Sequence, residues 1–320
     1  MISKSIKKQH PQHPANRKSL LKYLKNHWQL YIMILPPTIL LLIFAYGPMY
    51  GVMIAFKNYK ATLGIWGSPW TQQHGFYHFI KFFKNYNFIE CLRNTLVLSV
   101  YSLIVTVPCS VVLALCLNYT RYTKFRKTIQ MITYCPYFIS TVVFVGIIRL
   151  ILDTRMGILG SAVYETFGIN IIGNASAFPS LYVWSGVWQG TGYGAIIYLA
   201  TLAGVDMQLH EAAIIDGATL LQRIRHIDLP EVIPTAVIML ILNMGNILNV
   251  GYEKVLAMQN QNNLSTSEVI NTYAYKVSLV SSFPDFSYST AIGLFQSLVG
   301  LILLLSANKL ADKLSGNGFV

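Results

Sequence analysis

Apolar residues run along this chain in six long stretches that are separated by more polar segments. The stretches cover residues 31–56, 92–117, 129–152, 180–203, 233–252 and 287–307. Each has about the 20 residues that an α-helix needs to cross the hydrocarbon core of a bilayer. The pattern predicts an all-α integral membrane protein with six transmembrane helices.

The polar segments divide the chain into two parts. Residues 1–28 carry Pro11 and Pro14 and seven of the 24 Lys and Arg residues, so we predict a basic cytosolic arm there. Residues 29–320 form the predicted membrane domain. The first apolar stretch is longer than the core of a signal peptide and lacks a small-residue cleavage site, so no secretory cleavage is expected.

The basic residues also predict the orientation of the chain. With both termini in the cytosol, the inner segments hold fifteen Lys and Arg and the outer segments seven, while Arg93 and Arg149 lie at span edges. Because cytoplasmic loops carry the excess of Lys and Arg in membrane proteins, this orientation is favoured.

Composition narrows the class of protein further. Hydrophobic residues make up 54% of the 320 residues and charged residues only 11%. The charged share is well below the roughly 25% that is usual in a soluble domain. The net charge of +12 is spread over the N-terminal arm and the loops. This distribution is typical of basic residues that orient a membrane protein and contact anionic lipid, and it does not indicate nucleic-acid binding. The chain has no G-x-x-x-x-G-K-[ST] segment, so any driving ATP must bind another polypeptide.

The segment 205–230 is the polar interruption between the fourth and fifth apolar stretches. Asp206 is placed to cap a short helix, Gly217 to break it, and a second short helix follows. These features predict a two-helix loop held out from the membrane on the cytosolic side.

The same segment closely resembles the cytoplasmic EAA loop of permease subunits in binding-protein-dependent ABC importers. The matching residues are Glu211, Ala212, Ala213, Asp216, Gly217, Ala218, Ile227, Leu229 and Pro230. The loop precedes the next-to-last span, where the family has it. Two softer motifs, LPPTILLLIFAYGPMYGVMIAFKNY at 35–59 and GSPW at 67–70, resemble the branch of the maltose-type superfamily that serves complex sugars and polysaccharide fragments.

The resemblance implies a mechanism and a set of partners. The EAA loop is a coupling helix that docks on the ATPase subunit, with small Ala212, Ala213 and Ala218 permitting close approach and Gly217 setting the bend. Glu211 and Asp216 either pair with basic groups of the ATPase or cap the ends of the local helices.

The implied partners are two ATPase subunits that bind ATP and Mg, a second homologous permease and an extracellular substrate-binding lipoprotein. This chain itself is expected to bind no cofactor. The implied location is the bacterial plasma membrane, and the implied process is sugar uptake by alternating access.

Polar side chains within the spans are candidates for a substrate path. Asn243, Asn246 and Asn249 recur every three residues, which on a helix is one slowly drifting face, and Tyr252 and Glu253 follow. Amide side chains within a membrane span are costly unless they face protein or water. They form either a hydrogen-bonding track for a hydroxyl-rich solute or contacts with the partner subunit.

The fourth stretch offers aromatic candidates. Trp184 and Trp188 are one turn apart and lead into Gln189 and Tyr193, a combination that suits stacking and hydrogen bonding with a sugar. The alternative is an interfacial aromatic belt with core packing. Gly186, Gly190 and Gly194, spaced four apart, indicate close helix packing.

No set of residues indicates catalysis or a metal site. His74 and His78 have i, i+4 spacing but no third ligand nearby, and no nucleophile stands beside a base. The alternative function is an ion-coupled secondary transporter that works without an ATPase. Such a carrier is expected to hold ionisable groups in mid-span, which these stretches lack.

Overall fold

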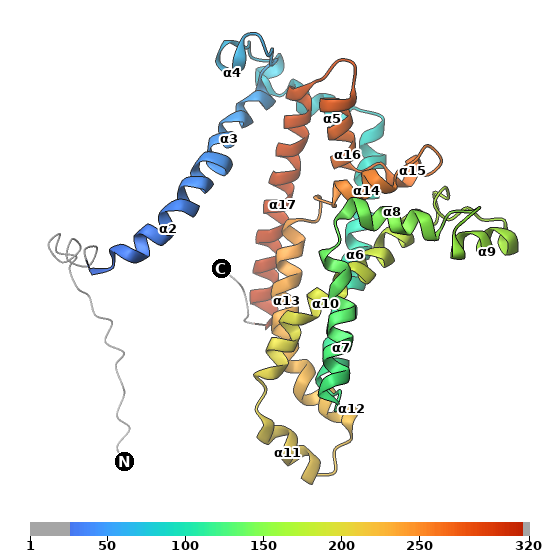
Figure 1. Cartoon of the computed structure of the whole chain (residues 1–320). Coiled ribbons are helices and arrows are strands. Elements are labelled where there is room, and N and C mark those ends of the chain that lie inside the picture. Colours follow the sequence, from blue (N-terminus) through green and yellow to red (C-terminus); the bar gives the residue numbers. More distant parts are fainter. Residues whose placement is uncertain (1–25, 316–320) are drawn as a thin grey trace. The chain divides into compact units, whose positions relative to one another are not determined.

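The structure is a computed structural model that describes residues 26–315, and its regular elements are helices (Figure 1). In this range the one strand-like feature is an isolated bridge between Lys57 and Trp70. The all-α prediction is therefore confirmed for the described range. The predicted basic arm at 1–28 lies almost wholly outside it. The chain divides into two units, one ending at Met53 and one beginning at Ile54.

The first unit is helical from Trp28 to its end. Helix α2 (Trp28–Leu41) continues through a π-turn, η1 (Leu42–Tyr46), into α3 (Gly47–Met49). In the π-turn the Gly47 N–H donates to the Leu42 carbonyl, five residues back. Such a wide turn is one way in which a helix accommodates a nearby proline, here Pro48, which has no N–H to donate. None of the α2 side chains is buried, as expected of a helix that faces lipid.

Four long helices form the frame of the second unit. They are α6 (Asn87–Asn118), α10 (Phe178–Ala203), α13 (Leu229–Gly245) and α17 (Phe286–Ser315). Helix α6 packs along α10, and α13 packs against α17 (Figure 1). Ala114 of α6 and Ala195 of α10 are fully buried in a cluster with Val232 of α13. Small side chains at this contact let the helix backbones approach closely.

Shorter elements connect the long helices. In chain order they are η2 (Tyr50–Phe56), α4 (Gly64–Gly67), η3 (Gln73–Gly75), α5 (Tyr77–Phe83), α7 (Thr123–Tyr134), η4 (Cys135–Phe138), α8 (Thr141–Ile151), α9 (Ile158–Phe167), α11 (Met207–Ile215), α12 (Leu220–Arg223), η5 (Ile224–Asp228), α14 (Tyr252–Met258), α15 (Leu264–Ser267), α16 (Ile270–Tyr275) and η6 (Lys276–Val280).

The described residues contain four helices that are long and apolar enough to cross a membrane, or five if one bent pair is counted as a span. The four are Trp28–Phe56, Asn87–Asn118, Leu220–Gly245 and Phe286–Lys313. Helix α10 has 26 residues but is not among them, because polar and small residues interrupt its apolar run. The structure thus supports a multi-span helical membrane protein.

The third predicted span, 129–152, is not one continuous helix. Helices α7 and η4 cover 123–138 and α8 covers 141–151, and the two parts are bent by 105°. Pro136 cannot donate a backbone hydrogen bond, and Ile139 has an extended backbone. Ser140 then caps a new helix by accepting a hydrogen bond from the Val143 N–H at 3.5 Å. The predicted span at 129–152 therefore consists of two helices with a sharp bend between them.

The fifth predicted span, 233–252, has its boundaries in the wrong places. The helix begins at Leu220, runs through η5 into α13 and ends at Gly245. Its start is fixed by a capping box between Thr219 and Gln222. Residues 246–251 form turns that lead to α14.

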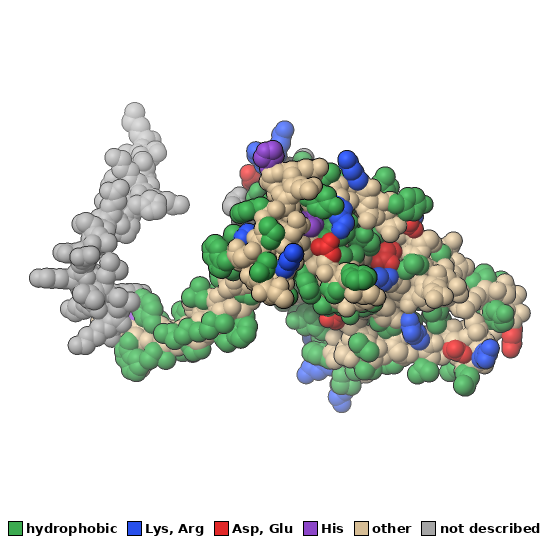
Figure 2. Space-filling view, turned by 90° about the horizontal axis from the view of Figure 1, so that it is seen from above, with side chains coloured by type: hydrophobic (Ala, Val, Ile, Leu, Met, Phe, Trp, Pro, Cys, Tyr) green, Lys and Arg blue, Asp and Glu red, His purple; other side chains and the backbone are tan. Residues whose placement is uncertain are grey.

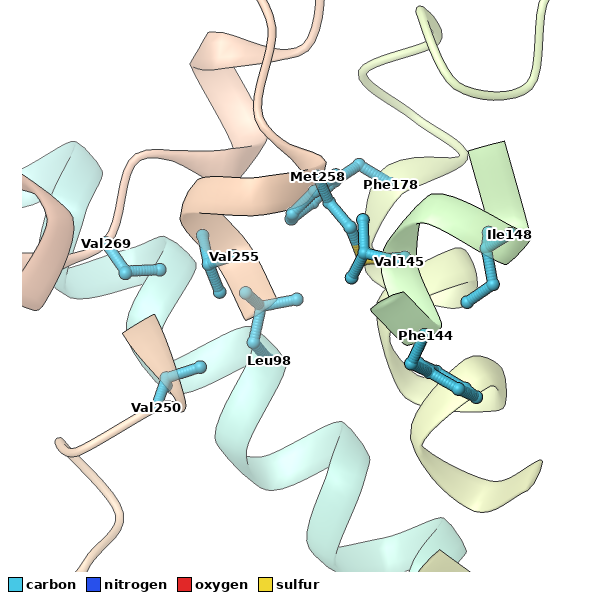
Figure 3. Close-up of a cluster of buried hydrophobic side chains, with 9 residues drawn as sticks. All are labelled: Leu98, Phe144, Val145, Ile148, Phe178, Val250, Val255, Met258 and Val269. Atoms are coloured by element: carbon cyan, nitrogen blue, oxygen red, sulfur yellow. The ribbon is translucent and has the colours of Figure 1, made fainter. Parts of the chain in front are cut away.

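Nine buried hydrophobic side chains connect these turns to the helical frame (Figure 3). They include Leu98 of α6, Phe144 of α8, Phe178 of α10 and Val255 of α14. Four helices meet in this cluster, so the non-helical segment after α13 is held against a packed core. This core positions the polar residues described below.

Charged side chains of both signs are scattered over the face shown in Figure 2. Two ion pairs tie the connecting segments together. Lys81 of α5 binds Asp285 at 2.9 Å, immediately before α17, and Lys276 of η6 binds Glu268 at 2.6 Å. Partly exposed pairs of this kind contribute little stability individually, and here they fix the orientation of short helices.

Candidate functional site

The loop at 205–230 folds as a short helix, a tight turn and a second helix. The Asp206 carboxylate accepts a hydrogen bond from the Gln208 N–H at 2.9 Å, which confirms the predicted cap of α11. Gly217 has a φ of +77°, a conformation in which side chains are disfavoured. The Gly217 N–H bonds to the Ile214 carbonyl at 3.0 Å and the Ala218 N–H to the Ala213 carbonyl at 2.8 Å. These two bonds form a Schellman motif that ends α11.

Six of the nine residues matched to the EAA loop lie together on α11 and the turn after it. Glu211, Ala212 and Ala213 are on α11, and Asp216, Gly217 and Ala218 form its C-terminal turn. No α11 residue is buried, and Ile215 is 85% exposed. The N-caps of the two helices are Asp206 and Thr219, so Asp216 caps neither N-terminus. The arrangement leaves a small-residue helix with apolar neighbours exposed on the surface of this chain.

A cavity of about 250 Å³ lies between α6, α10 and the C-terminal end of α13. Its polar lining comes from Asn243, Asn246 and Asn249 together with hydroxyl groups of α6 and α10. The remaining polar groups are Ser99, Ser102, Thr106 and Tyr182. No Lys, Arg, Asp or Glu lines it, so the cavity suits the hydroxyl groups of an uncharged part of a solute.

The three asparagines converge on this cavity, but they are not on one helical face. Only Asn243 lies within α13; Asn246 is its C-cap, and Asn249 follows in the turns. The Asn243 and Asn246 amides donate to the carbonyls of Met239 and Leu242, at 2.7 and 3.4 Å. The expectation of a continuous helical track is therefore wrong, although the residues do share one wall.

Neighbouring side chains hold this wall in position. The Asn249 amide oxygen accepts a hydrogen bond from the Asn271 amide at 2.7 Å. Gln296 of α17 donates to the Leu248 carbonyl at 2.8 Å, and the Ser99 hydroxyl donates to the Ile247 carbonyl. Because α6 and α17 both bind the turn, its shape is set before any solute enters.

Lys254 anchors the opposite end of the same segment. This buried ammonium group donates to the Tyr182 carbonyl at 3.0 Å and lies 4.8 Å from the Tyr182 ring centroid. The Phe144 ring is 5.6 Å away. Since Tyr182 and Gly251 both line the cavity, Lys254 holds α14 against α10 at the cavity's edge.

The aromatic candidates of α10 do not line this cavity. Trp184 and Trp188 are 53% and 51% exposed in this chain. The Trp184 indole N–H donates to the Tyr101 hydroxyl at 3.1 Å, and the Trp188 ring lies 5.2 Å from the Phe144 ring. Neither side chain is among the residues that line the cavity with the asparagines.

Gln189 and Tyr193 lie instead at the bend between η4 and α8. The Gln189 amide donates to the Ile139 carbonyl at 3.3 Å and lines a shallow hollow there with Ser140. The Tyr193 ring stacks on Tyr137, with centroids 3.9 Å apart. These contacts support the bend.

Tyr252 and Glu253 begin α14 next to the cavity residue Gly251 without lining the cavity themselves. Both are exposed. The Tyr252 ring lies 6.1 Å from the Tyr275 ring.

The polar groups of α6 were not singled out from the sequence. Ser99, Ser102 and Thr106 are spaced at i, i+3 and i+7, which is a readable stripe on one helical face. Nothing in the sequence indicates that this stripe faces the asparagines. Among the described residues no group of three or more His, Cys, Asp and Glu is arranged to hold a metal ion.

Comparison with known families gives a match over most of the chain. Residues 93–316 match the model of the family described as binding-protein-dependent transport system inner membrane component.

Two proteins of Bacillus subtilis (strain 168) are similar over nearly their whole length. Protein LplB is 39% identical over 302 residues, covering 94% of this chain and 93% of that protein. The polygalacturonan/rhamnogalacturonan transport system permease protein YteP is 40% identical over 304 residues, with the same coverage.

A solved structure is similar in fold. It is a chain from the crystal structure of a bacterial ABC transporter involved in the import of the acidic polysaccharide alginate. That chain is 33% identical and has a TM-score of 0.82, and the match covers 93% of this chain and 99% of that one.

Proposed function

This chain belongs to the family of binding-protein-dependent transport system inner membrane components, and from that membership we propose that its cargo is an oligosaccharide or a polysaccharide fragment. The family match covers 93–316, and two relatives are about 40% identical over nearly their full length. The chain is thus a membrane permease of an ABC importer, as the EAA-type resemblance predicted, and not itself the catalytic ATPase.

The observation that carries the cargo proposal is the uncharged polar cavity. Hydroxyl and amide groups of Ser99, Thr106 and Asn243 face a space bordered by apolar side chains such as Leu103 and Val107. Sugars offer both hydroxyl groups and apolar C–H faces, so such a lining suits them. The relatives named for polygalacturonan and alginate transport support the same class of cargo.

We further propose that the chain spans the membrane six times with both termini in the cytosol. Helix α10 has 26 residues and is therefore roughly 39 Å long, enough to cross a bilayer. With α10 and the bent pair each taken as one span, the four remaining helices complete six. The excess of Lys and Arg in the inner segments supports this orientation.

In this arrangement α11 and its turn lie in the cytosol and form the docking element for an ATPase. The exposed α11 surface, the small Ala212 and Ala213 and the Schellman turn at Gly217 are suited to insertion into a groove. ATP and Mg bind the two ATPase partners. A second permease completes the path, and a substrate-binding protein delivers the cargo.

The ion-coupled carrier has less support. Within the described residues the candidate spans Asn87–Asn118 and Phe286–Lys313 carry their charged side chains near their ends. A proton- or sodium-driven carrier is expected to hold ionisable groups in mid-span. Family membership assigns the energy source to ATP instead.

Purification from native membranes tests the assembly directly. We expect the detergent-solubilised chain to carry with it a P-loop ATPase, a second EAA-containing permease and a binding protein, identified by mass spectrometry. Recovery of the chain alone, with uptake that follows an ion gradient and needs no ATP, contradicts the proposal.

Substitution of the asparagine wall tests the path. We expect Asn243→Ala and Asn246→Ala to raise the cargo concentration for half-maximal uptake by about three- to tenfold, because each removes a hydrogen-bonding group worth about 1 kcal/mol. The measurement is uptake of labelled neutral and acidic oligosaccharides by proteoliposomes. Asn262→Ala, at an exposed position outside the cavity, is the control. Equal uptake by all variants contradicts the proposed path.

A further inference from the structure

Asp228 is a carboxylate buried at the base of the coupling loop. It is the last residue of η5, directly before α13, and its exposed fraction is 0%. Acidic side chains are almost never fully buried unless they are paired, because removing a carboxylate from water is costly. The partners of Asp228 therefore define what this position does.

Two side chains from different helices meet at this carboxylate. The Tyr119 hydroxyl, immediately after α6, donates to Asp228 Oδ2 at 2.5 Å. His210 of α11 places Nε2 3.4 Å from Oδ1, and its side chain is only 12% exposed. Asp228 thus connects the end of α6, the coupling helix α11 and the start of α13.

The surroundings of Tyr119 reinforce the junction. Its ring lies 6.4 Å from the His210 ring, edge to face, and 5.8 Å from the Arg223 guanidinium carbon. Burial, the hydrogen bond to Asp228 and the charge of Asp228 raise the pKa of Tyr119 to about 12. The phenol therefore stays protonated at neutral pH and remains a hydrogen-bond donor.

His210 and Ala213 are the half-buried residues of α11, and its other residues are exposed. Helix α11 has no buried residue, and the Schellman turn at Gly217 separates it from α12. A force applied to α11 therefore reaches the rest of the chain through the two chain ends of the loop and through side-chain contacts, among them those of His210 with Asp228 and Tyr119.

We propose that Asp228 is a positioning residue that makes α11 move together with α6 and α13. This inference rests on the proposed coupling function of α11. Both helices held by Asp228 line the cavity, through Thr106 of α6 and Asn243 of α13. From Tyr119 to Thr106 is roughly 20 Å of helix, and from Asp228 to Asn243 roughly 22 Å. Displacement of the coupling loop is thereby transmitted to both cavity walls at once.

The test measures whether α11 and α6 move as one body. Spin labels at Gln208 of α11 and Val112 of α6, both exposed, report their distance in the complete importer after the native cysteines are replaced. Distances are compared between the nucleotide-free and the vanadate-trapped complex by double electron–electron resonance. This readout needs no identified cargo.

We expect the distance to be the same in both states with the native junction. In His210→Ala and in Tyr119→Phe, we expect it to differ by about 2 Å or more between the states, because α11 then moves without α6. Tyr119→Phe removes only a hydroxyl, so it keeps the ring next to Arg223. His226→Ala is the control, since His226 is exposed and bonds the Gln222 carbonyl of its own helix.

A distance that changes with the native junction, or variants that behave like the control, would overturn the role of Asp228. Failure of the proposed function looks different. In that case the purified complex has no ATPase activity, and there is no trapped state to compare.

Discussion

We expect Gly217→Val to reduce cargo uptake by at least about tenfold, while the permease still inserts in the membrane at its normal level. Gly217 has a φ of +77°, and a β-branched side chain in this conformation costs about 1–2 kcal/mol. The space around the position is open, with nothing within 4 Å of an added Cβ, so the effect comes from the backbone. Relief of this strain breaks the Schellman turn and misdirects α11 from the ATPase.

The measurements are ATP-driven uptake by proteoliposomes and the amount of ATPase that co-purifies with the permease. Gly217→Asn is the matched control, because asparagine tolerates the left-handed conformation better than other side chains. We expect it to keep most of the activity. Equal uptake by the Val variant and the native protein would show that the turn at Gly217 does not govern docking.

The sequence predicted the helices whose apolar runs are long and uninterrupted. The stretches 92–117 and 287–307 lie within α6 and α17, and both are candidate spans. Length and hydropathy suffice there, because a helix in lipid has to satisfy its own backbone hydrogen bonds. The cap at Asp206 was also readable, since it depends on a local side-chain contact.

The break within the third apolar run is indicated by local residues, although the hydropathy of the run predicts one span. Pro136 is typical of a residue that ends a helix, and Ser140 of one that caps the start of the next helix. Both lie inside an apolar segment that is long enough for one span. The bend is stabilised by contacts from α10, such as the Gln189 amide on the Ile139 carbonyl. Such contacts depend on tertiary packing, which one sequence does not reveal.

The three asparagines line one cavity, although the helical geometry predicted for their segment is wrong. The three-residue spacing suggested a helical face, yet α13 ends at Gly245. At Gly300 an added Cβ would lie 2.5 Å from the Gly245 carbonyl oxygen, so the close approach of α17 to the end of α13 requires glycine at position 300. The wall is formed by a turn that α6 and α17 hold, and periodicity alone cannot predict that.

The glycines of α10 lead to the second large expected effect. The spacing of Gly186, Gly190 and Gly194 indicated close helix packing. This is confirmed at Gly194, where an added Cβ would lie 2.8 Å from the Ser110 hydroxyl of α6, but nothing lies within 4 Å of a Cβ added at Gly190. At Gly192 an added Cβ would lie 2.1 Å from the Thr133 carbonyl oxygen and 2.4 Å from its carbon. The closest helix contact of these four positions is therefore at Gly192, outside the four-residue pattern.

Gly192→Ala is expected to destabilise the permease by about 1–3 kcal/mol. The obstructing atoms belong to the α7 backbone, which cannot rotate away as a side chain can, so α7 and α10 have to separate. The separation also disturbs the bend that follows α7. The measurement is thermal unfolding of the purified complex in detergent, together with its yield.

Gly190→Ala is the matched control on the same helix. Because its added methyl group meets open space and alanine favours the helix by about 1 kcal/mol, its unfolding temperature should equal or exceed that of the native protein. If only Gly192→Ala lowers the unfolding temperature, the close contact between α7 and α10 depends on the glycine at position 192. Equal unfolding temperatures for the two variants would mean that the helices can separate at little cost, and that this close approach does not hold the bend in place.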